Sequence, residues 1–238
     1  CFPTKSRDAD LESIGKKSFE KNKVMGQKVN PKGLRTGVIY NWDSRWFFSK
    51  RKQFKDTLIS DIKIRDMIYE KFNFASVTSV VIERAINKIT VIIHAVKPGM
   101  IIGRGGKGLE DVKKVIMLYL NPSATKKNKE TKVDLRIEPV KKPYLSARYV
   151  AQSIAEKLVK SFPHRGVVHN TMSRVMESGA KGIKIQLGGR IQGAEISRRE
   201  KYFLGTVPTS TIREDVDFIA YPALTKSGYI GVKVWICK

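Results

Sequence analysis

The order of hydrophobic periodicities in the first half of the chain constrains its fold more than any other feature of the sequence. An apolar stripe at helical spacing comes first, and two runs follow in which apolar and polar residues alternate as they do in strands. A short apolar turn, a glycine cluster, a second helical stripe and a third alternating run complete the series. The expected elements are a helix over 50–71, strands over 76–84 and 88–96, a helical turn at 100–102, a helix ending near 120 and a strand over 132–138. Together they predict an α+β unit with the order α-β-β-α-α-β.

A second unit is expected after Pro139 and Pro143, which interrupt the last strand pattern. Its elements are predicted as helices over 144–161 and 165–178, a strand over 182–187, a basic turn and helix over 188–204, and strands near 212–221 and 229–237. Gly179 is placed to end the second helix. The predicted order is therefore α-α-β-α-β-β, an α/β domain, and the whole chain is expected to belong to the α+β class.

The charge of the chain indicates a polyanionic partner. Lys and Arg together number 46 against 22 Asp and Glu, which gives a net charge of +24. Such an excess destabilises a compact protein by self-repulsion unless a polyanion offsets it. The partner could be nucleic acid, an anionic membrane or an acidic protein, and a membrane is a weaker candidate because no apolar run approaches the ~18 residues of a spanning helix. Nucleic acid is therefore the leading partner class, and a solvated basic surface is the alternative.

A glycine cluster, GRGG at 103–106, lies between two predicted helices, and this position decides how it is interpreted. With Gly108 the cluster matches the pattern of a dinucleotide fingerprint, but that motif requires a strand directly before the glycines. A P-loop is excluded because Gly108, and not Ser or Thr, follows Lys107. The element order instead favours a K homology (KH) loop of the form Gly-x-x-Gly. A flexible linker between two helices is the alternative.

The chemistry of a KH loop is directed at RNA phosphate. Glycine lets the backbone come against a phosphodiester because no Cβ is in the way. The helix that follows presents free N–H groups and the positive end of its dipole, and the adjoining hydrophobic groove holds the bases of a single strand. The residues expected to contact RNA here are Gly103, Arg104, Gly105, Gly106 and Lys107.

Five stretches of the chain have a distinctive sequence. They are MGQKVNPKGLRTG (25–37), VIERAINKITVIIHAVKPGMIIGRGGKGLEDV (81–112), GAKGIKIQLGGRIQGAEISRRE (179–200), VPTSTIREDVDF (207–218) and GYIGVKVWI (228–236). In these stretches the chain resembles the bacterial-type small-subunit ribosomal protein number three, the universal uS-three family. The resemblance extends over about residues 25–238 and implies a type II KH domain followed by a C-terminal ribosomal-protein domain.

The resemblance implies a structural ribonucleoprotein component that acts in translation and is not an enzyme. Its implied place is the head of the small ribosomal subunit. The partners expected there are small-subunit ribosomal RNA, messenger RNA and neighbouring ribosomal proteins, with no membrane and no cofactor. A cytoplasmic ribosome is expected, with an organellar ribosome as the alternative. The alternative function is that of a free-standing KH-type regulator of single-stranded RNA, which repeated KH modules would favour, but the sequence shows no internal repeat.

Four segments are expected along the chain. Residues 1–24 are predicted to be an extra leader without fixed structure, 25–48 an N-terminal arm, 49–139 the type II KH domain and 140–238 the C-terminal domain. Met25 matches the usual start of the resembling family. The leader has no apolar run of the kind that a secretory signal needs, and it carries acidic residues that transit peptides lack.

The arm mixes glycine, basic and aromatic residues without periodicity. One interpretation is that it packs on its own domain and buries the aromatic residues Trp42, Trp46, Phe47 and Phe48. The other is that the arm docks on RNA, where Lys28, Lys32 and Arg35 contact phosphates.

A basic cluster at the start of the 165–178 helix lines the channel through which messenger RNA enters in the resembling family, and it helps to unwind structured messenger. The matching positions here form what we name the messenger patch: Arg165, Gly166 and His169. The family pattern at these positions is Arg, Arg and Lys, so only Arg165 keeps a fixed charge, because histidine with a reference pKa of ~6.5 is mostly neutral near pH 7. Lys160 and Arg174 are candidate substitutes.

A second basic constellation comprises Arg190, Arg198, Arg199 and Lys201. Guanidinium groups offer bidentate geometry to phosphate, which favours contact with ribosomal RNA. The alternative is a solvated helix face on which these residues pair with Glu195 and Glu200.

No catalytic or metal site is expected. The residues weighed as ligands are His94, His164, His169, Asp215 and Asp217. His94 lies in the middle of a strand, and the other two histidines have no nearby Cys or third ligand. The aspartate pair alternates outward on a predicted strand without a third acidic partner, which favours a solvated strand face.

Overall fold

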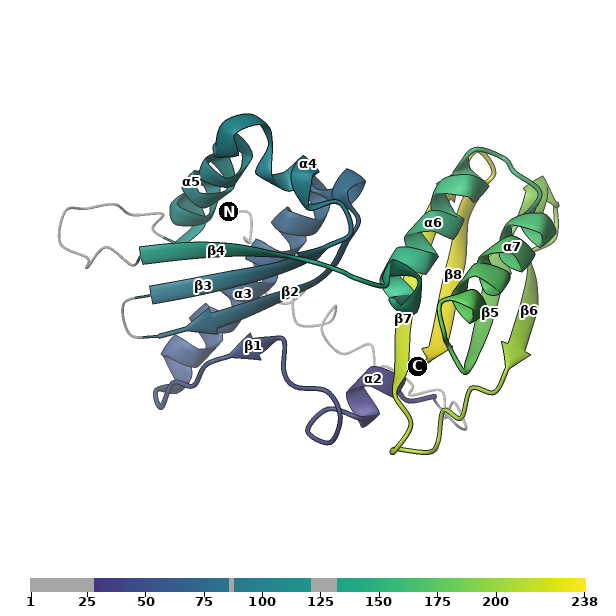
Figure 1. Cartoon of the computed structure of the whole chain (residues 1–238), viewed down its shortest axis with the longest axis horizontal. Coiled ribbons are helices and arrows are strands. Elements are labelled where there is room, and N and C mark those ends of the chain that lie inside the picture. Colours follow the sequence, from purple (N-terminus) through teal and green to yellow (C-terminus); the bar gives the residue numbers. More distant parts are fainter. Residues whose placement is uncertain (1–27, 86–87, 121–131) are drawn as a thin grey trace, which may run out of the picture.

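The structure, a computed structural model, describes residues 28–85, 88–120 and 132–238, without the side chains of Arg104, Leu118 and Leu120. The predicted leader and the loop predicted at 121–130 lie outside these ranges. Figure 1 shows two units side by side, each with a sheet and its own helices. The prediction of an α+β chain with a KH-like unit followed by an α/β unit is confirmed.

The first unit has the predicted order α-β-β-α-α-β. Its elements are α3 (Arg51–Lys71), β2 (Val77–Arg84), β3 (Lys88–Ala95), α4 (Pro98–Ile102), α5 (Lys107–Leu120) and β4 (Lys132–Pro139), with the short 3-10 helices η1 (Asn73–Ala75) and η2 (Arg104–Gly106) between them. β2 and β3 pair antiparallel, and β3 and β4 pair parallel. The parallel pair is possible because α4 and α5 carry the chain back across the sheet.

Burial in the first unit follows the alternation along β3 and the apolar stripe on α5, but on α3 the stripe that Phe54, Leu58 and Ile62 form in the sequence is exposed. The predicted inward residues of β3, from Ile89 to Ala95, are all buried. Ile64 and Ile68 lie one helical turn apart on α3 and are fully buried, as are Val112 and Ile116 on α5. These side chains pack in one cluster with the inner face of the sheet. One continuous apolar core therefore holds the helices that carry the glycine loop.

The second unit packs two helices on one face of an antiparallel sheet. Its elements are η3 (Pro143–Leu145), α6 (Ala147–Val159), α7 (His164–Glu177), β5 (Gly182–Gly189), η4 (Ile191–Gly193), β6 (Arg198–Gly205), β7 (Val216–Thr225) and β8 (Gly228–Cys237). The strand order is β6-β5-β8-β7. Ile183, Ile185 and Leu187 point from β5 into the core beneath α6 and α7, where they are fully buried. Figure 1 shows both helices on the same face of this sheet, so neither of them covers the opposite face.

The predicted helix over 188–204 is wrong. The segment instead forms the single turn η4 and the edge strand β6, so the second unit reads α-α-β-β-β-β. Three glycines, at 188, 189 and 193, disfavour a helix at its start. The rest of the segment is a strand because it pairs with β5. Every residue from Gly182 to Gly189 pairs with one from Arg198 to Gly205. β7 also begins later than predicted, at Val216.

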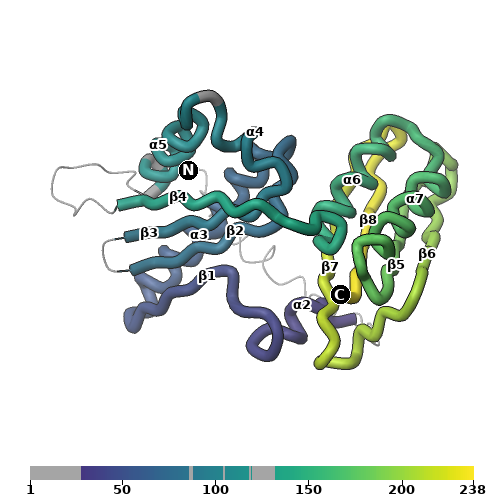
Figure 2. Tube along the Cα trace, viewed as in Figure 1, coloured from purple at the N-terminus to yellow at the C-terminus, as the bar shows by residue number. Residues whose placement is uncertain are grey.

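The arm connects the two units. Its helix α2 (Pro31–Leu34) lies beside β7, and its strand β1 (Ser44–Arg45) adds to the first sheet by pairing parallel with β2. Figure 2 shows this path, from the second unit back to the first. The Tyr40 hydroxyl donates to Asp215, and burial is the main cause that raises the Tyr40 pKa. The arm therefore packs on its own chain, which agrees with the first of the two interpretations. Two of its four aromatic residues, Trp42 and Phe47, nevertheless stay exposed.

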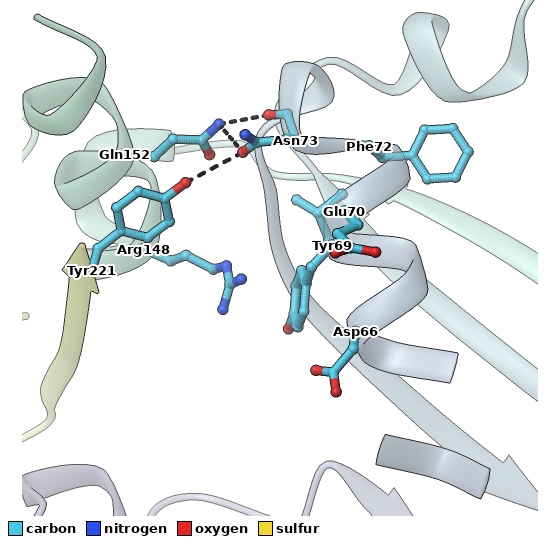
Figure 3. Close-up of a pocket in the computed structure, with 9 residues that line it drawn as sticks. Asp66, Tyr69, Glu70, Phe72, Asn73, Arg148, Gln152 and Tyr221 are labelled. Carbon is cyan, nitrogen blue, oxygen red and sulfur yellow. Dashed lines mark hydrogen bonds between the residues drawn. The ribbon is translucent and has the colours of Figure 1, made fainter. Parts of the chain in front are cut away.

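Polar side-chain contacts also connect the two units directly (Figure 3). The Gln152 side-chain amide on α6 donates to the Asn73 main-chain carbonyl at 2.5 Å and to its side-chain oxygen at 2.9 Å. The Tyr221 hydroxyl approaches the same side-chain oxygen at 3.4 Å. The Arg148 guanidinium lies 3.6 Å from the centre of the Tyr69 ring. The residues of these contacts line a cleft of about 520 Å³.

Candidate nucleic-acid interface

The glycine loop has backbone angles that favour glycine at three of its positions. Gly103, Gly105 and Gly106 have φ values of 68°, 63° and 78°, in the left-handed region where a side chain would be strained. Lys107 begins α5 and is exposed. The loop thus places bare backbone directly before the N-terminal turn of a 14-residue helix. The side chain of Arg104 lies outside the described part of the chain.

Gly108 sets the distance between the helices on either side of the loop. A Cβ at this position would lie 2.4 Å from the Ile101 carbonyl oxygen and 3.0 Å from that of Ile102. Only glycine therefore lets the first turn of α5 pack against the end of α4 this closely. Gly108, which matched a nucleotide-binding pattern in the sequence, acts here as a packing residue.

Apolar surface adjoins the glycine loop. Met100 and Ile102 on α4 are 49% and 38% exposed, while Ile101 between them is fully buried and anchors the helix. Phosphate groups can approach the loop backbone and the N-terminus of α5, and unstacked bases can lie on the neighbouring apolar side chains. The arrangement offers surfaces that suit the phosphates and the bases of single-stranded nucleic acid.

Arg35 is not available for phosphate, so its assignment to RNA contact is corrected. Its side chain is fully buried, and its guanidinium donates to main-chain carbonyls only. The acceptors are Pro31 at 3.0 Å, Pro208 at 3.1 Å, Thr209 at 3.2 Å, Thr211 at 2.7 Å and Glu214 at 2.6 Å. Arg35 instead holds the arm against the segment that precedes β7.

The two lysines predicted for the arm differ in their surroundings. Lys32 lies 3.5 Å from the Asp43 carboxylate and over the Tyr40 ring, so part of its charge is compensated. Lys28 is exposed and makes no ion pair among the described residues. Lys28 therefore remains the stronger candidate for phosphate.

The messenger patch lies on the first two turns of α7. Arg165, Gly166 and His169 are all exposed, and the first turn carries no acidic residue. The positive end of the helix dipole adds to the Arg165 charge. A Cβ at Gly166 would meet no atom within 4 Å, so a longer side chain fits there. Of the candidate substitutes, Lys160 is exposed, whereas the Arg174 side chain donates to the Tyr144 hydroxyl at 3.1 Å.

The strand geometry of β6 divides the second basic constellation. Arg198 and Glu200 share one face, where the Arg198 Nε lies 2.7 Å from the Glu200 carboxylate. A hydrogen bond from the Tyr202 hydroxyl, together with His164 and Arg198, lowers the Glu200 pKa. Arg199 and Lys201 point to the opposite, open face and are exposed. The expected pairing with Glu200 therefore holds for Arg198 alone.

Arg190 precedes η4 and is exposed. Its Nε donates to the Ala194 carbonyl at 2.9 Å, which orders the turn between β5 and β6. The remaining guanidinium nitrogens stay available to a ligand.

Three of the residues weighed as metal ligands instead make hydrogen bonds or close polar contacts within the chain. The Asp217 carboxylate accepts the Ala147 main-chain N–H at 2.9 Å and so caps α6. His94 Nδ1 lies 3.5 Å from Glu138, and His164 Nε2 lies 2.8 Å from Glu200. No cluster of three such groups occurs among the described residues.

Sequence reasoning missed two basic residues on the open face of the second sheet, Lys184 and Lys233. The sequence did contain a signal for them. Both lysines alternate with the apolar residues that were predicted to point inward on these two strands, so they had to point outward. Their connection to Arg199 and Lys201 could not be seen while 188–204 was interpreted as a helix. Among the described residues, no helix has the length and apolar character needed to cross a bilayer.

Two family models match the chain, one for each unit. A model described as a KH domain matches residues 63–145, and one described as the C-terminal domain of ribosomal protein S3 matches residues 154–236. Curated relatives match across both units. A protein of Clostridium novyi is 43% identical over 214 residues, which cover 90% of this chain and 93% of the relative. One of Lachnoclostridium phytofermentans is 46% identical over 212 residues, 89% of this chain and 92% of the relative. Both relatives carry the name small ribosomal subunit protein uS3.

Proposed function

Because this chain belongs to the family of the small ribosomal subunit protein uS3, a structural protein and not an enzyme, we propose that it is built into the head of the small subunit. There it binds ribosomal RNA and neighbouring ribosomal proteins. The observation that carries this proposal is the match at 43–46% identity over about nine-tenths of the chain, which includes both units. The net charge of +24 supports it, since a polyanionic surrounding offsets the self-repulsion of the protein.

Sedimentation of a cell extract through a sucrose gradient tests this proposal. We expect the chain in the small-subunit peak in one-to-one ratio with other proteins of that peak, measured by quantitative mass spectrometry. A soluble pool with no small-subunit peak would contradict the proposal and favour a free-standing KH regulator. We place the chain on cytoplasmic ribosomes, and the same gradient run on an organelle fraction separates this location from an organellar one.

The RNA contacts that we propose follow from the exposed cations and the glycine loop. Gly103, Gly105, Gly106 and Lys107 present backbone and charge to phosphate next to an apolar surface. Lys28, Arg190, Arg199 and Lys201 are exposed cations without carboxylate partners among the described residues. Arg198, which is paired with Glu200, is expected to contribute less.

The messenger patch is proposed to line the channel through which messenger RNA enters. Support comes from the exposed positions of its three residues, the helix N-terminus and the absence of acidic residues from the first turn of α7. With one fixed charge, the patch is expected to assist unwinding only weakly.

Restoring two charges to the messenger patch is expected to improve translation through messenger hairpins. In the variant Gly166→Arg with His169→Lys, both new side chains project into solvent, since nothing obstructs position 166. Each added cation contacts a strand phosphate of the messenger and favours the single-stranded form. The measurement is the translation rate through a hairpin of graded stability.

The matched control adds two cations to the exposed residues Ser49 and Gln53, as Ser49→Lys with Gln53→Arg. This control is expected to leave the hairpin dependence unchanged. Equal rates for both variants and the unaltered chain would argue against a role of the patch in the channel.

A further inference from the structure

We propose that the open face of the second sheet and the arm residues 28–34 together form a second RNA site, a groove that holds the phosphodiester backbone by charge. We name this site the sheet groove. It rests on the proposed function, since it assigns one region of RNA contact within the same particle. The sheet groove lies in the second unit, whereas the glycine loop lies in the first. It binds through basic side chains, whereas the loop presents main-chain N–H groups.

The floor of the sheet groove is built by strand register. On β6, Arg199 and Lys201 point to the open face and lie roughly 7 Å apart, as alternate residues of a strand do. Lys201 pairs with Gln186 on β5, and Gln186 pairs with Lys233 on β8. Lys201 and Lys233 therefore face the same side across two strand spacings, roughly 10 Å. Lys184 lies on the same face as Gln186, one alternate position along β5.

Two glycines leave part of the groove floor without side chains. Arg199 pairs with Gly188, and Gly188 pairs with Gly231 on β8. No side chain rises from either glycine, so ligand atoms can reach the sheet backbone beside the Arg199 guanidinium. The result is a cationic row next to a bare strip of sheet.

The arm supplies the wall of the sheet groove. Asn30, Pro31 and Leu34 line one side of a cleft of about 740 Å³, and Lys28 contributes its charge from the same side. The arm is fixed in this position because the Arg35 guanidinium binds both Pro31 and the segment before β7. The groove is therefore a composite site, formed by residues from the two ends of the sequence.

The charge of the sheet groove is uncompensated. Its basic residues are Lys28, Lys184, Arg199, Lys201 and Lys233. No Asp or Glu lines the groove, and none of these five makes an ion pair within the described ranges. Like charges gathered this closely repel one another, and a bound polyanion removes that cost.

Trp235 and Phe218, the two aromatic residues that line this cleft, do not offer a stacking platform. Trp235 is only 9% exposed, packs on Phe218 at 4.9 Å between ring centres, and has the Lys184 ammonium 5.4 Å from its own ring. A base cannot reach the covered indole face. The contact is therefore with phosphate, and binding is expected to be independent of sequence. Charge alone would also suit an acidic protein, but the proposed place of the chain in an RNA particle favours a phosphodiester backbone, whose charge binds exposed Lys and Arg.

Neutralising the groove tests this inference. The full chain with Arg199→Gln, Lys201→Gln and Lys233→Gln keeps long polar side chains but loses three cations. For a short single-stranded RNA of mixed sequence, the slope of log affinity against log salt is expected to fall in magnitude by about two, since each phosphate contact contributes ~0.7. The control is Lys55→Gln, Lys63→Gln and Lys226→Gln, which removes the same charge from exposed positions outside the groove. Equal slopes for the two triple variants would overturn the proposal.

A cross-linking experiment covers the case in which the triple variant folds poorly. A photoreactive residue in place of Gln186 lies on the groove floor, and it is expected to form adducts with ribosomal RNA in purified small subunits. Adducts with protein only, or none at all, would overturn the sheet groove while leaving the proposed function intact. A chain that never enters small subunits would instead contradict the proposed function itself.

Discussion

Replacement of Arg35 by Ala will lower the free energy of unfolding by about 3–5 kcal/mol and release the arm from the second unit. Arg35 is fully buried, and its guanidinium donates to carbonyls on both sides of the contact between α2 and the segment before β7. Without it, the buried Pro31 carbonyl and four half-buried carbonyls lose their partner, at about 1–3 kcal/mol for each group that water cannot reach. Urea unfolding measures the loss, and faster hydrogen exchange in residues 206–215 locates it.

The matched control for Arg35 is Arg213→Ala. Arg213 is exposed and belongs to the segment that Arg35 holds, so its loss is expected to change stability by less than ~0.5 kcal/mol. Arg35→Lys is expected to recover little, because an ammonium cannot reproduce the planar fork of donors. If Arg35→Ala unfolded like Arg213→Ala, the arm would not depend on this network.

Replacement of Asp61 by Ala will destabilise the first unit by a similar amount, about 3–5 kcal/mol, because it leaves a buried cation without its partner. The Asp61 side chain is fully buried on α3 and forms an ion pair with Arg84 on β2, whose side chain is 10% exposed. Its other oxygen accepts from the Trp46 indole at 2.6 Å and from the Ser44 hydroxyl at 3.1 Å. One carboxylate thus connects a helix, a strand and the arm.

Two measurements check the prediction for Asp61. Thermal or urea unfolding gives the stability change, and tryptophan fluorescence reports whether the Trp46 indole has moved into water. Asp56→Ala is the control, since Asp56 lies on the same helix but is exposed. Similar unfolding of the two variants would show that the buried pair contributes no net stability.

Most of the first unit was predictable from the sequence because each of its elements is indicated by a pattern within its own residues. Alternation along β3 and the i, i+4 spacing on α5 identify their own buried faces, and neighbouring elements in the sequence are neighbours in the fold. On α3 the spacing of Phe54, Leu58 and Ile62 pointed to the wrong face, because the buried residues are Ile64 and Ile68. The position of the glycine loop between two helices followed from the same patterns. The short helix α4 was recognised as an apolar turn at 100–102 that the glycines end, although it begins two residues earlier, at Pro98.

The second unit was harder because tertiary pairing decided the state of one segment. Residues 198–205 carry no strong apolar alternation, and only register with β5 makes them a strand. The helix interpretation placed Arg198, Arg199 and Lys201 on one surface, whereas a strand sends Arg198 to the other side. The basic face that includes Lys184 and Lys233 was hidden for this reason.

Arg35 shows a second limit of sequence reasoning. A basic residue in a polar arm next to lysines suggests contact with phosphate, and nothing local contradicts that interpretation. Apart from Pro31, its acceptors lie 173 to 179 residues away in the sequence. Burial of a cation against main-chain carbonyls from a distant segment has no signature in the neighbouring residues.

The strand order of the second sheet has a consequence for biosynthesis. β5 lies between β6 and β8, and β8 is separated from it in the sequence by both β6 and β7. During translation the apolar sides of β5, α6 and α7 emerge well before β8 completes the sheet on which the two helices pack, while the first unit already has all the strands of its own core. A nascent chain paused in this interval would expose aggregation-prone surface, so this interval is where a chaperone would be needed most.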